Sequence, residues 1–94
     1  MTYLEFEQKT PYEVTRDVAQ AMRARRKERG FSQAELAQRA GVSLGSLKRF
    51  ERTHEIALAS LVRLALALGC EEDFERLFAH RQYRSIQEVI DAQK

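Results

Sequence analysis

The side chains with the most evident chemistry are three cations that share one face of a helix predicted over residues 43–52. At about 100° per residue, these cations surround Gly45, and the apolar side chains of the segment point to the opposite side. Lysine and arginine donate hydrogen bonds to phosphate oxygens, and arginine can also bind the edge of guanine through two hydrogen bonds. A glycine at the centre lets the helix backbone approach a ligand closely. The cations are Lys48, Arg49 and Arg52, and the apolar residues are Leu47 and Phe50.

The charge distribution along the chain favours a polyanionic partner. The formal net charge of the whole chain is only +2. Residues 16–54 contain ten Lys or Arg against four acidic residues, whereas the rest of the chain contains six against ten. A basic segment inside a nearly neutral chain is typical of proteins that bind nucleic acid, although a basic helix face can also be merely solvated.

Composition indicates one soluble, mostly helical domain. The chain has 94 residues, of which 44% are hydrophobic and 32% charged, with four glycines and one proline. This length provides one modest core but not two. No apolar stretch reaches the about 18 residues of a membrane span, and the polar start does not resemble a signal peptide. We therefore expect a single cytoplasmic domain over residues 1–94.

The residue patterns of enzymes and metal sites are missing. Cys70 is the single cysteine, which fits a reducing cytoplasm, and we expect it to pack as a small hydrophobe at a helix end. His54 and His80 have no Cys or His at metal-ligand spacing. No nucleophile elbow or glycine-rich phosphate loop occurs. We therefore expect no enzymatic activity, no metal and no cofactor.

Helix boundaries are marked by capping patterns. Thr10 with Glu13, and Ser32 with Glu35, have the spacing of capping boxes, and Ser43 stands where a third N-cap is needed. Glycines provide left-handed stops after the helices. These signals predict helices over residues 11–29, 33–40, 44–52 and 58–68, shorter helices over 71–78 and 85–93, and a possible strand only at "YLEFE".

The two short helices around the turn "AGVS" have the pattern of a helix-turn-helix. Ala37 is small enough for the two helices to cross closely, Gly41 permits the positive φ of a tight turn, and Val42 is placed to enter the core. In such a motif the second helix lies in the major groove of DNA while the first crosses the backbone.

The stretch "RRKERGFSQAELAQRAGVSLGSLKRFE" resembles the Cro and phage-repressor type of helix-turn-helix, the xenobiotic-response-element family. The resemblance covers about residues 16–69. It implies an all-α fold, a compact lambda-repressor-like bundle of about five helices with a short helical C-terminal tail. The DNA-binding core is then 10–69, the motif about 32–52 and the extension 70–94. The matching residues are Gly30, Phe31, Ser32, Gln33, Leu36, Ala37, Gly41, Val42, Ser43, Leu47, Phe50 and Glu51.

The resemblance also implies roles for individual positions. Gln33, with Ser32 beside it, corresponds to the family's phosphate contact at a helix N-terminus, where the helix dipole favours an anion. Arg26 and Glu51 match a pair that ties the first helix to the recognition helix, so they are expected to be structural. The predicted DNA-binding residues are Ser32, Gln33, Ser43, Leu44, Gly45, Ser46, Lys48, Arg49 and Arg52.

The sequence departs from the family at two recognition positions. Many relatives have an amide that reads adenine where this chain has Leu44 and Gly45, and neither residue donates a side-chain hydrogen bond. We expect base readout to rest on Arg49 at guanine, helped by Lys48, with Leu44 touching a thymine methyl. The alternative for Arg49 is a phosphate contact or a solvated side chain. Lys48 and Arg52 are expected to contact phosphates.

These features predict a sequence-specific repressor that acts as a homodimer on a pseudo-palindromic operator. "GVSLGSLKRFER" and the upstream "TPYEV" also resemble small antitoxins of the HipB type, which bind their own operator and hold a HipA-type kinase toxin. That role would use residues 71–94 as a partner surface. The alternative is that Phe74, Leu77 and Phe78 close the core or the homodimer. An adaptor that has lost DNA binding is disfavoured by the cations around Gly45.

Overall fold

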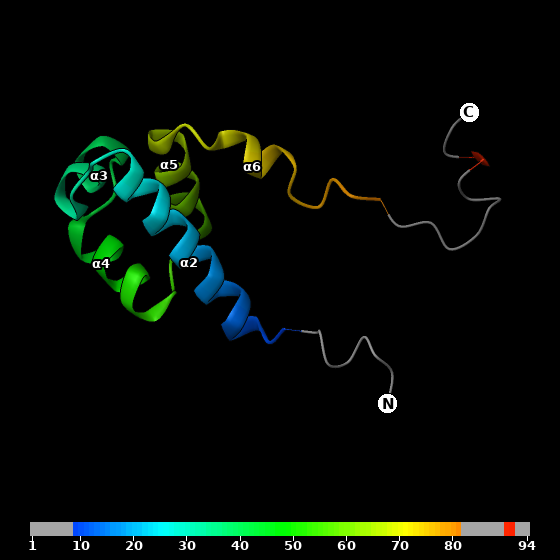
Figure 1. Cartoon of the computed structure of the whole chain (residues 1–94), viewed down its shortest axis with the longest axis horizontal. Coiled ribbons are helices and arrows are strands. Elements are labelled where there is room, and N and C mark those ends of the chain that lie inside the picture. The colour runs from blue at the N-terminus through cyan, green and yellow to red at the C-terminus, as the bar shows by residue number, and fades with distance from the viewer. Residues whose placement is uncertain (1–8, 82–89, 92–94) are drawn as a thin grey trace.

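The computed structural model of the protein describes residues 9–81 and 90–91 and shows an all-α bundle (Figure 1). The long α2 crosses the bundle, α3 and α4 lie together at one end of it, α5 packs beside α2, and α6 leads away from the bundle. With the labels of Figure 1, the helices of this part of the chain are α2 (Pro11–Glu28), α3 (Gln33–Ala40), α4 (Leu44–Thr53), α5 (Leu58–Leu68) and α6 (Glu71–Glu75).

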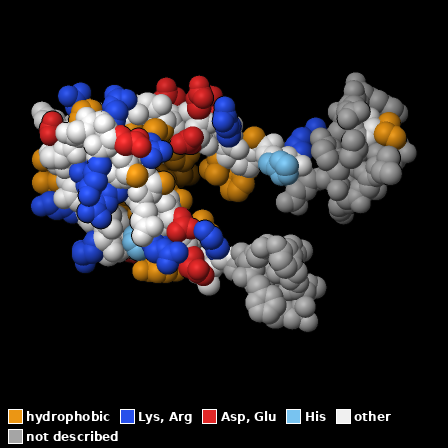
Figure 2. Space-filling model, in the orientation of Figure 1, with side chains coloured by type: hydrophobic (Ala, Val, Ile, Leu, Met, Phe, Trp, Pro, Cys, Tyr) orange, Lys and Arg blue, Asp and Glu red, His pale blue; other side chains and the backbone are white. Residues whose placement is uncertain are grey.

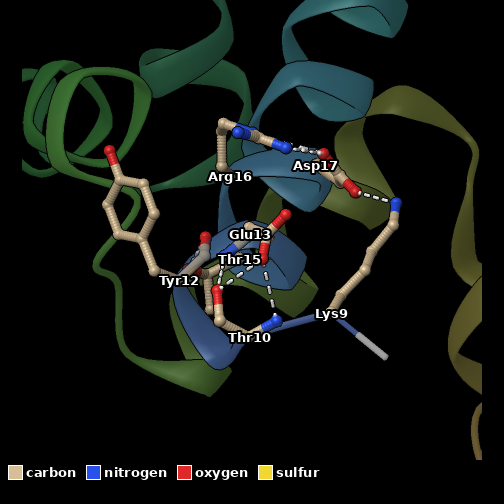
Figure 3. A network of polar contacts seen from close by, with 7 residues as sticks. All are labelled: Lys9, Thr10, Tyr12, Glu13, Thr15, Arg16 and Asp17. Carbon is tan, nitrogen blue, oxygen red and sulfur yellow. Dashed lines mark hydrogen bonds and ion pairs between the residues drawn. The ribbon is translucent and has the colours of Figure 1, made fainter. Parts of the chain in front are cut away.

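Local capping explains where α2 and α3 begin. The Thr10 side chain accepts a hydrogen bond from the backbone N–H of Glu13 at 3.1 Å, and the Thr10 backbone N–H donates to the Glu13 carboxylate at 3.1 Å (Figure 3). The same reciprocal bonds join Ser32 and Glu35 at the start of α3. Both capping boxes predicted from the sequence are therefore confirmed.

The α3 capping box makes the stability of the protein depend on pH. The hydrogen bond from the Ser32 backbone N–H lowers the pKa of Glu35 below its usual value of 4.5. Because the folded state holds the carboxylate ionised, its stabilising effect is complete above the unfolded pKa and is lost as pH falls through the lower folded pKa. We expect Glu35→Gln, which keeps the acceptor oxygen, to show a smaller fall in melting temperature below about pH 4.5 than the unsubstituted protein. Equal acid sensitivity in circular-dichroism melts would contradict this role.

Left-handed residues end the central helices. Gly41 (φ 69°) follows α3 and Gly69 (φ 73°) follows α5, as the sequence predicts. The end of α4 differs, because His54 holds the left-handed conformation at φ 68° without being a glycine. A non-glycine residue there is uncommon, and the imidazole ring of His54 packs on the Tyr12 ring at 5.3 Å between centroids.

The core lies where α2, α3, α4 and α5 meet. Its four largest fully buried side chains come from α3, α4 and α5, and α2 contributes the smaller Ala19 and Met22. Arg26, 8% exposed as a whole residue, is the most buried charged residue among the described ones. The buried apolar residues are Ala19, Met22, Leu36, Ala37, Val42, Leu47, Phe50, Leu64, Ala65 and Leu68.

The structure shortens the predicted tail helix. The sequence predicts a helix over residues 71–78, but α6 ends at Glu75. No side chain caps its start, and beyond it Leu77 is 52% and Phe78 94% exposed, so no apolar contact extends the helix. Isolated single turns of helix are marginal without packing. The predicted strand "YLEFE" and most of the predicted helix over 85–93 lie outside the described residues, although residues 90–91 are helical.

Candidate nucleic-acid interface

The turn between α3 and α4 fixes the orientation of α4. Val42 is buried at the turn, and its backbone N–H donates to the Ala37 carbonyl oxygen at 3.0 Å. Leu47 and Phe50 are 0% and 2% exposed, so the inner face of α4 is committed to the core. The opposite face of α4 must therefore point to solvent.

In this segment the sequence predicts DNA contacts for the N-cap of α4 and for six residues of α4 itself. Ser43, Leu44, Gly45, Ser46, Lys48, Arg49 and Arg52 are all exposed. A Cβ added to Gly45 would meet nothing within 4 Å, so no packing contact within the described part of the chain explains the glycine. Lys and Arg side chains are spread over the end of the molecule that holds α3 and α4, and Asp and Glu gather near the start of α6 (Figure 2).

Ser43 caps α4 and is hydrogen-bonded to Ser46. The Ser43 side chain accepts a hydrogen bond from the Ser46 backbone N–H at 3.1 Å, and its hydroxyl donates to the Ser46 hydroxyl oxygen at 2.8 Å. Ser43 is thus the N-cap that the sequence predicts. Because the Ser43 hydroxyl donates to Ser46 Oγ, the Ser43 proton is used and the Ser46 O–H remains as a donor for a ligand.

Arg49 has an ion-pair partner that the sequence analysis missed. Its Nη2 donates to Glu55 Oε2 at 3.1 Å, across the end of α4, and both side chains are more than 60% exposed. Such an exposed pair contributes about 1 kcal/mol or less, so it orients the guanidinium without holding it firmly. Lys48 and Arg52 have no ion-pair partner within residues 9–81 and 90–91. The sequence holds no clear signal for the Arg49 pair, because the left-handed conformation of His54 between the two residues is seen only in the structure.

A buried carboxylate joins α2, α3 and α4. Arg26 Nε and Nη2 donate to the two carboxylate oxygens of Glu51, both at 2.9 Å, and Arg26 Nη1 donates to the Phe31 carbonyl oxygen at 2.9 Å. The side chains of Arg26 and Glu51 are 9% and 7% exposed. The structure thus brings together the two residues that the family resemblance pairs, beneath the surface that α3 and α4 form.

The start of α3 lies beside this carboxylate. Gln33 Nε2 donates to Glu51 Oε1 at 3.1 Å, and Arg23 Nε lies 3.7 Å from the same oxygen. Ser32 Oγ accepts the capping bond from Glu35, which leaves its hydroxyl proton for another partner. The Gln33 and Ala34 backbone N–H groups, which precede the capped Glu35 N–H, have no intrahelical partner, so they present donors here. Arg23 was missed by the sequence analysis, although it lies one turn before Arg26 on α2.

Other basic residues of the same segment are engaged elsewhere. Arg29 and Arg39 stack on the Phe31 ring, at 5.6 and 4.5 Å from its centroid, and Arg25 pairs with Glu28 at 2.7 Å. Stacking on an aromatic ring does not neutralise a guanidinium, so Arg29 and Arg39 keep their positive charge, as Lys48 and Arg52 do on α4.

The comparisons with known proteins agree with this geometry. A helix-turn-helix family model, of the Cro/C1 type, matches residues 22–74, more than half of the chain. The match spans α3, α4 and α5 completely. No curated protein and no solved structure matches the chain. Among the described residues, no helix is long and apolar enough to cross a membrane, and no group of three or more acidic, His or Cys side chains is placed to hold a metal ion.

Proposed function

Because this chain belongs to the Cro/C1-type helix-turn-helix family of DNA-binding transcription regulators, we propose that it is a repressor that binds a pseudo-palindromic operator as a homodimer. Such a protein acts in the cytoplasm, on the bacterial nucleoid. The observation that carries the proposal is the outer face of α4, where three exposed cations surround a glycine with no neighbour within 4 Å of its Cβ position.

The α4 face has the chemistry that a major groove requires. The groove is wide enough for one helix. With Lys48 and Arg52 on phosphates, α4 is held in register, and the bare surface at Gly45 lets its backbone approach the bases. Leu44, 38% exposed at the start of α4, supplies the apolar contact for a thymine methyl. Arg49 supplies the guanine contact once its guanidinium leaves Glu55.

The start of α3 supplies the second set of contacts. Ser32 and Gln33 face the DNA backbone at a helix N-terminus and position α4 without reading sequence. In a homodimer, two copies of α4 enter successive major grooves about 34 Å apart. Leu58 and Leu66 on α5, 66% and 56% exposed, offer apolar surface for a two-fold contact.

Selection from a random-duplex library, followed by a salt titration, tests this function. The protein should enrich a two-fold symmetric site and bind it with two chains per duplex. The logarithm of the association constant should fall with the logarithm of salt concentration, with a slope of several counterions. A flat line, or no enriched sequence, contradicts the proposal.

Arg49→Ala tests the base-reading role. We expect the variant to lose about 1–3 kcal/mol of discrimination at one base pair of each half-site, because a bidentate contact to guanine disappears. Folding should change little, since the Arg49–Glu55 pair is exposed. Anisotropy titrations against the selected site and its single-base variants measure the effect. Arg52→Ala is the matched control and should weaken binding to all these duplexes alike. Uniform weakening by Arg49→Ala would instead assign Arg49 to the phosphate contacts.

We propose as a second function that the chain is an antitoxin of the HipB type, which also holds a HipA-type kinase toxin. The observation in favour is the exposure of Leu77 and Phe78, which do not close the core of the described chain. Phe78 also has a positive φ of 60°, a conformation uncommon for a bulky side chain. A kinase-like gene adjacent to this one, and co-purification of its product that is lost when residues 71–94 are deleted, would support this function. A solitary gene counts against it.

A further inference from the structure

Two guanidinium groups lie beside the Glu51 carboxylate, which carries a single negative charge. Arg26 is bonded through Nε and Nη2 to the carboxylate and through Nη1 to the Phe31 carbonyl oxygen. Glu51 thus neutralises the Arg26 guanidinium, and each of the three guanidinium nitrogens donates to a protein oxygen. Arg23 approaches the same carboxylate from one turn earlier on α2, with Nε 3.7 Å from Glu51 Oε1. Its side chain is 56% exposed, and its charge has no second carboxylate to balance it in the described part of the chain.

Gln33 shares the carboxylate oxygen that faces Arg23. Gln33 Nε2 and Arg23 Nε lie 3.1 and 3.7 Å from Glu51 Oε1, so the two side chains are neighbours although they come from α3 and α2. Each has donors that no described residue occupies, namely the terminal N–H groups of Arg23 and the second amide N–H of Gln33. Glu51, held by Arg26, thereby keeps the remaining donors of Arg23 and Gln33 close to each other.

We propose that Arg23 and Gln33 clamp one phosphate of the DNA backbone, with Glu51 as the residue that positions both. The inference rests on the proposed function and adds Arg23, which lies outside the helix-turn-helix motif, to the phosphate contact already proposed for Gln33. A phosphate fits this place because its oxygens accept from both donors and its charge balances the excess positive charge of Arg23. The contact reads no base, so it strengthens binding to every sequence equally.

The test compares Arg23→Gln with Arg25→Gln in binding to a duplex of mixed sequence across a salt series. Both substitutions remove one positive charge from an exposed position of α2. Arg25, however, pairs with Glu28 and points to a different side of the helix. We expect the slope of log association constant against log salt to become shallower by about 1 for Arg23→Gln and to stay unchanged for Arg25→Gln. Melting temperatures of both variants should match that of the unsubstituted protein.

A double variant determines whether the two residues share one phosphate. If they do, Arg23→Gln and Gln33→Ala together weaken binding by less than the product of their separate fold-changes. Independent effects would overturn the shared clamp. An unchanged slope for Arg23→Gln, beside a steep slope for the unsubstituted protein, would overturn the Arg23 contact while leaving the proposed function intact. A flat line for the unsubstituted protein would overturn the proposed function itself.

Discussion

Glu51→Ala is expected to lower the free energy of unfolding by about 3–5 kcal/mol, the largest effect on stability that we predict. The substitution leaves the Arg26 guanidinium buried without a counter-ion, since both side chains are less than 10% exposed. It also removes the acceptor of the Gln33 amide. Because a small domain is stable by only about 5–15 kcal/mol, a large part of its stability is lost. Urea denaturation followed by circular dichroism measures the change.

Two further variants test whether the loss of stability comes from the unpaired buried charge or from the lost side-chain volume. Glu28→Ala also removes a carboxylate that pairs with an arginine, but its side chain is 61% exposed, so we expect a change of about 1 kcal/mol or less. Replacing Arg26 by Met together with Glu51 by Leu removes both charges and keeps apolar volume. We expect the double variant to recover most of the stability. A loss from Glu51→Ala no larger than that from Glu28→Ala would show that the buried pair is not structural.

Gly45→Leu is expected to leave the fold intact and to weaken operator binding about 5- to 150-fold. Apart from its chain neighbours and the backbone of its own helix, no described atom lies within 4 Å of the position of an added Cβ, so the free protein accommodates the side chain. In the complex, the same side chain fills the space between α4 and the DNA, and overpacking of this kind costs about 1–3 kcal/mol. Melting temperature and anisotropy titration of the operator measure the two effects separately.

Gly45→Ala is the matched control for this glycine. Alanine should raise the free energy of unfolding by about 0.5 kcal/mol, because glycine is the poorer helix former and the new methyl group meets no other atom. The measured gain gives the stability that the chain loses by having glycine at this position. Unchanged operator affinity in Gly45→Leu would exclude close backbone approach as the reason for the glycine.

The extents of α2 to α5 could be predicted because their boundaries depend on nearby residues. The Ser32–Glu35 capping box and the left-handed Gly41 and Gly69 act over three or four positions, so their spacing in the chain is the information needed. The outward face of α4 follows equally from helical periodicity, once Leu47 and Phe50 are assigned to the core. The tail was less predictable, because Leu77 and Phe78 continue the helical spacing of Phe74 but lie exposed beyond the end of α6.

The sequence by itself therefore determined the helices, the turn between α3 and α4, and the cationic face around Gly45, all through interactions between residues close in the chain. Only the tertiary structure decided which charges remain available on that surface. Arg23 and Arg26 from α2 and Gln33 from α3 converge on Glu51 of α4, and Arg49 meets Glu55 across a left-handed turn. Charge pairing depends on distances of a few ångströms between side chains, and the packing of the helices sets those distances.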